Sequence, residues 1–226
     1  MSSKGTNLKE KVRIALTSTA KVISDDFVVN DKNSKNEKSK DSSSIEVEAL
    51  TSPADFIRLR AETDSAALKK KFSNNTIYRK NLPSSASCRS LYNIDEKIRN
   101  ESLGGKMLKG IEKNFSDNYT QIIKYKRKDQ LKTKEDVPVS EAFELYMLKN
   151  FHQIQLNSLT TKMLNFWEKD FNSSIDKHID FLTKNIEDQS SYSSKFSEIL
   201  QEMDIFNSEN DEEKNKDEDK NEQDNK

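Results

Sequence analysis

The stretch IDEKIRNESLGGKMLKGIEKNFSDNYTQI, residues 94–122, decides the fold. Its apolar side chains recur every three to five residues, which is the spacing of one helix face. Gly104 and Gly105 interrupt this pattern and Gly110 follows, and each glycine inside a helix costs about 1 kcal/mol relative to alanine. The stretch therefore predicts a long helix that either breaks at the glycine pair or is approached closely there by another backbone.

Helical periodicity continues on both sides of this stretch. We expect helices over Asn7–Ile23, from the Ser52–Pro53 start signal to about Phe72, from Pro138 to Phe151, and over residues 192–203. A long amphipathic helix is expected over about 30 residues from Leu156 to Ile186, with its weak point at Asn172–Ser174. Loop composition marks residues 74–75, 81–85 and 124–134.

A short hairpin is expected near the N-terminus. Phe27–Val29 is β-prone, and Ile45–Ala49 alternates apolar and polar residues. The predicted fold class is therefore mainly α, a helical bundle over residues 1–206 with one small β-hairpin. The positions expected in its core are Leu16, Leu59, Leu68, Ile111, Phe143, Met163, Trp167 and Leu200.

The composition indicates that part of the chain lies outside any core. Only 32% of the 226 residues are hydrophobic and 34% are charged, and the polar residues concentrate in Asn30–Ser44 and Asn207–Lys226. We expect both segments to be disordered, because they lack the apolar area that offsets the entropy of ordering. The net charge is −1, and the acidic tail at 207–226 carries −5, which leaves +4 on residues 1–206. That charge is too small for a dedicated nucleic-acid binder.

The single cysteine, Cys88, excludes a disulfide framework within the chain and fits a reducing compartment. No apolar stretch approaches the roughly 20 residues that a membrane-spanning helix needs. The polar start, Met1–Glu10, has no signal-peptide apolar region. By elimination, the sequence predicts a cytoplasmic protein without a membrane partner.

Catalytic patterns are not found in the sequence. His152 and His178 lie far apart, and neither has a metal-type ligand at helical spacing. Cys88 lies in a predicted serine-rich loop without an evident histidine partner, so an inert thiol is the simpler interpretation. The glycine pair lacks the spacing of a phosphate-binding loop. We therefore expect no catalytic residue, no metal ligand and no cofactor-binding residue in this chain.

Two charged segments are the candidate partner-binding residues. In the predicted helix after Ser52, Arg58 with Glu62 and Arg60 with Asp64 stand four residues apart, which favours ion pairs worth tenths of a kcal/mol. The second segment is the basic cluster around Lys126, Arg127 and Lys128, with Lys132 and Lys134 beyond it. An ordinary solvated surface explains either segment equally well on composition alone.

Several stretches, in the same order, resemble one family. LRAETDSAALKKKF (59–72) resembles the "LRGxADxxAL" helix of the CobT-type subunit of the aerobic, ATP-dependent cobaltochelatase. IDEKIRNESLGGKMLKGIEKNF (94–115) is similar to its "EQARxEAxGARxMxGVxxNL" segment, with Gly105 and Gly110 on family glycines. Pro138–Leu148 resembles "PLAEALxLMVRE", and Trp167 falls near the family's "LW". EDQSSY (187–192) with ILQEMD (199–204) resembles "xDQxxFA…LLxxLD".

The resemblance also has departures. Ala61 stands where the family has the glycine of "RG", and Lys149–Gln153 lacks the family's proline pair. The family continues beyond an acidic linker into a von Willebrand A-like domain with an Asp-x-Ser-x-Ser metal site. We find no such pattern here, and expect a fragment or a shortened or split gene product.

The resemblance implies a non-catalytic accessory subunit in a hetero-oligomer. Such a subunit couples an AAA+ ATPase subunit to the large subunit that inserts cobalt into a corrin ring. ATP, magnesium and cobalt would then be handled by partner subunits or by the missing domain. Two alternatives from other classes are an unrelated helical adaptor with an acidic tail, and a nucleic-acid binder that uses Lys124–Lys134. The balanced charge disfavours the second of these.

Overall fold

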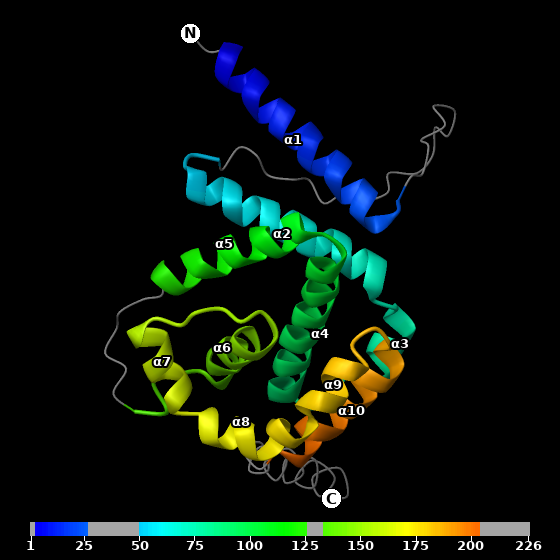
Figure 1. The fold of residues 1–226 in the computed structure, drawn as a ribbon, viewed down its shortest axis with the longest axis vertical. Helices are drawn as coiled ribbons and strands as arrows, with labels where there is room; N and C mark the ends of the chain where they lie inside the picture. The colour runs from blue at the N-terminus through cyan, green and yellow to red at the C-terminus, as the bar shows by residue number, and fades with distance from the viewer. Residues whose placement is uncertain (1–2, 27–49, 126–132, 204–226) are drawn as a thin grey trace, which may run out of the picture. The chain divides into compact units, whose positions relative to one another are not determined.

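The computed structural model describes residues 3–26, 50–125 and 133–203 (Figure 1). Every regular element in these ranges is a helix, which confirms the mainly α class for the described part of the chain. The predicted hairpin at Phe27–Val29 and Ile45–Ala49 lies outside the described residues. So do the segment at 30–44 and the acidic tail at 207–226, both predicted to be disordered.

The helices follow one another with short connections. They are α1 (Ser3–Ser24), α2 (Pro53–Phe72), α3 (Asn75–Lys80), α4 (Ala86–Met107), α5 (Lys109–Tyr125), α6 (Val139–Phe151), α7 (Ser158–Asn165), α8 (Glu168–Ile175), the 3₁₀ turn η2 (Asp176–His178), α9 (Ile179–Lys184) and α10 (Gln189–Glu202). They divide into two compact units, the first within Met1–Ser73 and Asn100–Ile122, the second within Asn74–Arg99 and Ile123–Lys226.

The first unit is built on the packing of α1 against α2. Leu16 of α1 and Leu59 of α2 form a buried cluster with Val12 and Leu50 at its edge. Leu68 is fully buried in the same unit. Leu16, Leu59, Leu68 and Ile111 are therefore core residues, as the helical spacing predicts.

The second unit surrounds α6, which is buried nearly all round, as its composition predicts. The ring of Phe143 meets Phe171 of α8 edge-on at 5.6 Å between centroids and lies 6.0 Å from Phe196 of α10. Met163 and Leu200 are buried too. Trp167 departs from the expected core because it is only partly buried, and its indole N–H donates to the Val137 carbonyl at 3.0 Å.

The expected break at the glycine pair lies slightly further along the chain. Helix α4 runs through Gly104 and Gly105 to Met107, and the break comes at Leu108. The close approach is confirmed at Gly104, although a side chain makes it. A Cβ at this position would lie 2.4 Å from Cδ1 of Leu68. Gly104 is therefore explained by space and not by backbone conformation, since no glycine among the described residues has a positive φ.

The single long helix expected over residues 156–186 is wrong. The chain instead forms α7, α8, η2 and α9, with breaks at 166–167 and 176–178, while Asn172–Ser174 stays inside α8. Both α7 and α8 pack against α6, so their apolar faces turn toward one core although the axis changes direction. Apolar spacing records which residues face that core, and it is insensitive to a break that preserves the facing.

Two further differences concern capping. A short helix, α3, follows Asn74, whose side chain accepts hydrogen bonds from the amides of Thr76 and Ile77. Helix α4 starts at Ala86, so Cys88 lies in its first turn instead of in a loop. Asparagine and serine favour both loops and helix N-caps, and composition alone does not separate the two.

Candidate functional site

Helix α2 carries the first predicted partner-binding segment, and its start is fixed by a capping box. The Asp55 amide donates to Oγ of Ser52 at 3.2 Å, while Oδ2 of Asp55 accepts from the amides of Thr51 and Ser52. Hydrogen bonds from the Thr51 and Ser52 side chains, followed by that from the Thr51 amide, lower the pKa of Asp55 to about 2. The cap sets where the helix begins and hence which residues share each face.

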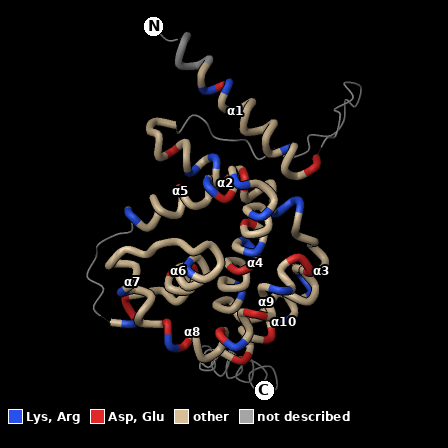
Figure 2. The backbone as a smooth tube through the Cα atoms, in the orientation of Figure 1, with Lys and Arg blue, Asp and Glu red and all other residues tan. Residues whose placement is uncertain are grey.

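Arg58 and Glu62 form the predicted ion pair on the outside of α2. The Nη1 of Arg58 lies 3.1 Å from Oε1 of Glu62, and about half of each side chain is exposed. Figure 2 shows basic and acidic residues side by side along this helix. These two residues remain accessible to a partner.

Arg60 and Asp64 do not form the second predicted ion pair. Asp64 is 1% exposed and accepts a hydrogen bond from Nδ2 of Asn114 at 2.7 Å. Burial raises its pKa, while the Asn114 hydrogen bond and the charge of Arg60 act in the opposite direction. Arg60 is half-buried, and its Nε is covered without a hydrogen-bond partner.

Helix geometry explains this division of the four charges. Residues two apart are separated by about 200° around a helix axis, so Arg58 and Glu62 face away from Arg60 and Asp64. The buried residues Leu59, Ala61, Ala67 and Leu68 place the core on the side toward Asp64. Of the four candidates, Arg58 and Glu62 are therefore surface residues, while Asp64 belongs to the core.

The second predicted segment is mostly beyond what the structure describes. Lys126, Arg127 and Lys128 lie outside the described residues, as does Lys132. Lys134 is described and is engaged within the second unit. Its Nζ lies 2.6 Å from Oδ2 of Asp170 and 4.1 Å from the ring centroid of Trp167. Lys134 is therefore held in place by packing and is a weaker candidate for partner contact than the sequence indicates.

A buried polar cluster on α4 escaped the sequence analysis. Asp95, Glu96 and Arg99 are at most 3% exposed, although charged residues are rarely buried without partners. Their partners come from the far end of the chain. Tyr192 donates to Oδ1 of Asp95 at 2.7 Å, and Nη1 of Arg99 donates to the Ile186 carbonyl at 3.0 Å.

Glu96 completes this cluster. Nε2 of Gln189 donates to it at 3.1 Å, Ser193 donates to its other oxygen, and Nε of Arg99 lies 3.6 Å away. Two carboxyl groups therefore share one buried cation. Burial raises the pKa of Asp95 well above its ordinary value, and the neighbouring Glu96 raises it further against the pull of Tyr192 and Arg99.

A smaller buried set lies in the first unit. Glu101 is 1% exposed and accepts from Oγ of Ser65 at 2.7 Å and from Oη of Tyr119 at 2.5 Å. Ser65 lies in α2 and Tyr119 in α5, so one carboxylate joins three helices. The shared signal is present in the sequence: acids stand at apolar-face positions of IDEKIRNES, where a solvated helix would have aliphatic residues.

The remaining chemistry-bearing residues are dispersed. Cys88 is 3% exposed, with its thiol 3.7 Å from the Leu200 carbonyl. His152 is half-buried, and burial, then the charge of Lys97, lowers its pKa to about 4. Burial, followed by the charges of Lys195 and Lys177, also lowers the pKa of His178. Within the described ranges, no three His, Cys, Asp or Glu side chains are arranged to hold a metal ion.

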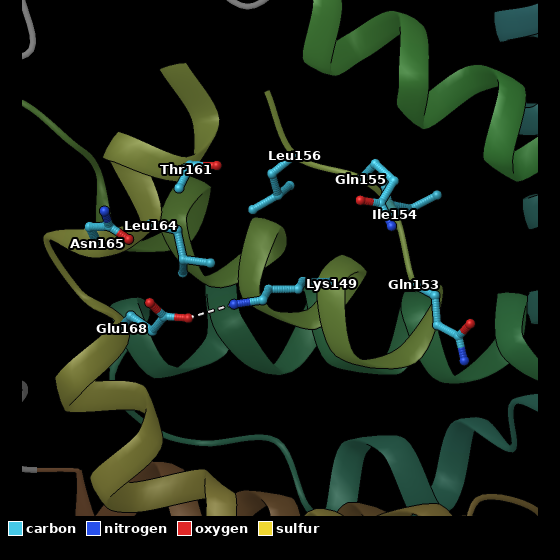
Figure 3. A pocket seen from close by; sticks show the side chains of 9 residues that line it. All are labelled: Lys149, Gln153, Ile154, Gln155, Leu156, Thr161, Leu164, Asn165 and Glu168. Atoms are coloured by element: carbon cyan, nitrogen blue, oxygen red, sulfur yellow. Dashed lines mark hydrogen bonds and ion pairs between the residues drawn. The ribbon is translucent and has the colours of Figure 1, made fainter. Parts of the chain in front are cut away.

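A cavity of about 400 Å³ opens between the end of α6 and α7 (Figure 3). Ile154 and Leu164 supply its apolar wall, and Gln153, Gln155 and Asn165 supply amide groups. Its charged groups, Lys149 and Glu168, are joined at 2.7 Å. Gln153 has a left-handed φ of 52°, uncommon for a residue other than glycine. The cavity offers hydrogen bonds, and its two charges already neutralise each other.

Within the described residues, the fold and these sites define a helical protein whose buried acids and bases tie helices together and whose exposed charges are available for contact. The chain belongs to the family described as cobalamin biosynthesis protein CobT, whose model matches residues 6–226. This confirms the resemblance found in the sequence, and the family implies an involvement in cobalamin biosynthesis. No curated protein and no solved structure matched the chain.

The family stretches coincide with the buried clusters. Residues 94–115 contain Asp95, Glu96, Arg99 and Glu101, and residues 187–192 contain Gln189 and Tyr192. The most recognisable residues are therefore largely internal. Across the described ranges, no helix combines the length and the apolar character needed to cross a bilayer.

Proposed function

We propose that this chain is a non-catalytic accessory subunit of a cobaltochelatase-like complex, in which it couples an AAA+ ATPase subunit to the large subunit that inserts cobalt into a corrin ring. In this proposal, ATP and magnesium are bound by the ATPase subunit and cobalt by the large subunit. The family match over residues 6–226 supports the pathway and argues against an unrelated adaptor.

The observation that carries the accessory role is the placement of the acids and bases. Asp64, Asp95, Glu96, Arg99 and Glu101 would be the natural candidates for acid–base work, and each is at most 3% exposed. Each of them also hydrogen-bonds another helix or a loop of the chain. A general acid or base must reach a substrate within hydrogen-bond distance, and these groups are closed off from any substrate. Binding is the function that this arrangement supports.

The test is a reconstitution with purified cognate subunits. The ATPase subunit and the large subunit should hydrolyse ATP and insert cobalt together when the chain is added. Cobalt insertion should fall to background when the chain is omitted. The isolated chain should do neither. Cobalt insertion that is unchanged by omission of the chain would contradict the accessory role.

The exposed face of α2 is tested in the same system with Arg58→Glu. We expect weaker capture of the ATPase subunit, because the substitution reverses an exposed charge and places it beside Glu62. Arg79→Glu is the matched control, since Arg79 is an exposed arginine on α3. Equal loss with both variants would indicate general electrostatic attraction, and no loss with Arg58→Glu would exclude this face. Arg60 is left unchanged here because it is half-buried.

A further inference from the structure

A small groove lies between α1 and α2, within the first unit. We call it the α1–α2 groove; Lys11, Val12, Leu16 and Thr19 line it from α1, and Phe56 and Arg60 line it from α2. The lining positions are one turn apart on each helix, so both helices present a continuous face to it. Its volume is about 230 Å³.

The size and the walls of the groove favour one type of occupant. Small-molecule and cofactor sites usually measure about 300–1,000 Å³, which is larger than this groove. An anchoring side chain of a protein partner, seated in a pocket, requires less space. Phe56 is 38% exposed here, and Val12 and Leu16 continue the apolar surface inward. The groove therefore fits a large apolar side chain.

Two cations stand at this apolar surface without an acidic partner. The neighbouring arginines are both paired, Arg13 with Glu10 and Arg58 with Glu62. Among the described residues, no ion pair joins Lys11 or Arg60 to an acid.

Arg60 in particular has unused hydrogen-bonding capacity. Its Nε has no partner among the described residues. Asp64 attracts Arg60 at a distance, but the Asp64 carboxylate is buried and accepts from Asn114. A guanidinium with free donors binds carboxylates strongly, because it can offer two parallel hydrogen bonds.

We infer that the α1–α2 groove binds a segment of a partner protein in which a large apolar side chain stands beside Asp or Glu. The apolar side chain lies against Val12, Leu16 and Phe56, and the carboxylate pairs with Arg60 and Lys11. This inference rests on the proposed function only in taking the occupant to be part of a protein partner. It adds a specific site and the chemistry that the site recognises.

The test begins with a phage-displayed library of random twelve-residue peptides, selected on the immobilised full chain. We expect enriched sequences to combine Leu, Ile, Phe or Trp with an adjacent Asp or Glu. The affinity of the best synthetic peptide is then measured by fluorescence polarisation. Phe56→Ala, and the double variant Lys11→Gln with Arg60→Gln, should each weaken binding about tenfold or more, as the loss of an anchor or of a charge pair does at interfaces.

The matched control is Lys21→Gln with Arg58→Gln. It removes one lysine of α1 and one arginine of α2, both exposed and neither lining the groove. Peptide affinity should stay unchanged, and thermal unfolding followed by circular dichroism shows that all variants are folded. Enrichment of peptides without the apolar–acidic pattern, or equal weakening by the control, would overturn the inference.

Capture of the intact subunits separates this inference from the proposed function. If the ATPase or the large subunit binds and the groove variants bind equally well, the groove is not the site, although the accessory role stands. If neither subunit binds while the selected peptides bind in the groove, the accessory role fails and the groove remains a protein-binding site.

Discussion

At the scale of single residues, Gly104 shows how a missing side chain can be required by packing. Gly104→Ala places a Cβ 2.4 Å and 2.6 Å from the two terminal carbons of Leu68, which is fully buried and has little room to move. We expect the free energy of unfolding to fall by about 1–3 kcal/mol, the usual cost of overpacking a core. Urea denaturation followed by circular dichroism measures the change.

Gly110→Ala is the matched control for this substitution. Gly110 also lies in a helix, α5, but nothing comes within 4 Å of a Cβ built on it. Alanine there should raise the free energy of unfolding by about 0.4–1 kcal/mol, because it reduces the conformational freedom of the unfolded chain. Equal and opposite signs at the two glycines distinguish packing from helix propensity; stabilisation by both substitutions would refute the role of Leu68.

Asp95 makes the stability of the protein depend on pH. Burial raises its folded pKa well above the unfolded value of about 4. Between those two pKa values, the folded state keeps a proton that the unfolded state has lost. The free energy of unfolding therefore falls as the pH rises, by up to about 1.4 kcal/mol per pH unit. Asp95→Asn preserves an acceptor for Tyr192 without the charge, and should remove this slope in urea melts across the pH range.

His152 provides an internal contrast of opposite sign. Burial lowers its folded pKa from 6.5 to about 4, with the charge of Lys97 acting in the same direction. The unfolded state therefore takes up the proton first, and stability is lost as the pH falls from 6.5 toward 4. His152→Gln should flatten that acid limb and leave the Asp95 slope in place. If Asp95→Asn leaves the alkaline limb unchanged, the buried carboxyl does not hold its proton.

At the scale of elements, the capping box of α2 fixes the helix that carries both the exposed ion pair and one wall of the groove. Ser52→Ala removes the side-chain acceptor of the Asp55 amide and should cost about 1 kcal/mol of stability. Ser116→Ala in α5 is the control, because Ser116 is an exposed serine in a helix interior and alanine is a better helix former there. Chemical denaturation of both variants provides the comparison, and a cost no larger than that of Ser116→Ala would contradict the capping role.

At the scale of the whole molecule, the buried cluster on α4 ties residues almost a hundred positions apart. Arg99→Met leaves Asp95 and Glu96 buried without a cation, and removing one partner of a buried charge pair typically costs about 3–5 kcal/mol. Adding Glu96→Gln removes one of the two stranded acids and should restore part of the loss. Unfolding free energies of the single and double variants form a double-mutant cycle; strict additivity would show that Glu96 and Arg99 do not interact.

The residues that carry the family resemblance were found by their order in the sequence, but their role was not. The sequence analysis interpreted Arg58, Arg60, Glu62 and Asp64 as one charged surface, and the structure divides them between the exterior, a groove and the core. The buried acids of α4 were not recognised at all. Their hydrogen-bond partners lie 87 to 97 residues away, beyond the reach of any local pattern.

The sequence by itself determined that the described chain is helical, where α2 and α6 begin, and which family the chain belongs to. These features depend on interactions within a few residues, namely apolar spacing, side-chain caps and proline, so they can be read along the chain. Only the tertiary structure decided that residues 156–186 form several short helices, that Gly104 is required by Leu68, and that Asp64 and Asp95 are internal. Burial and close contact depend on which distant segments meet, because the free energy of a charged or missing side chain is set by the atoms that surround it after folding.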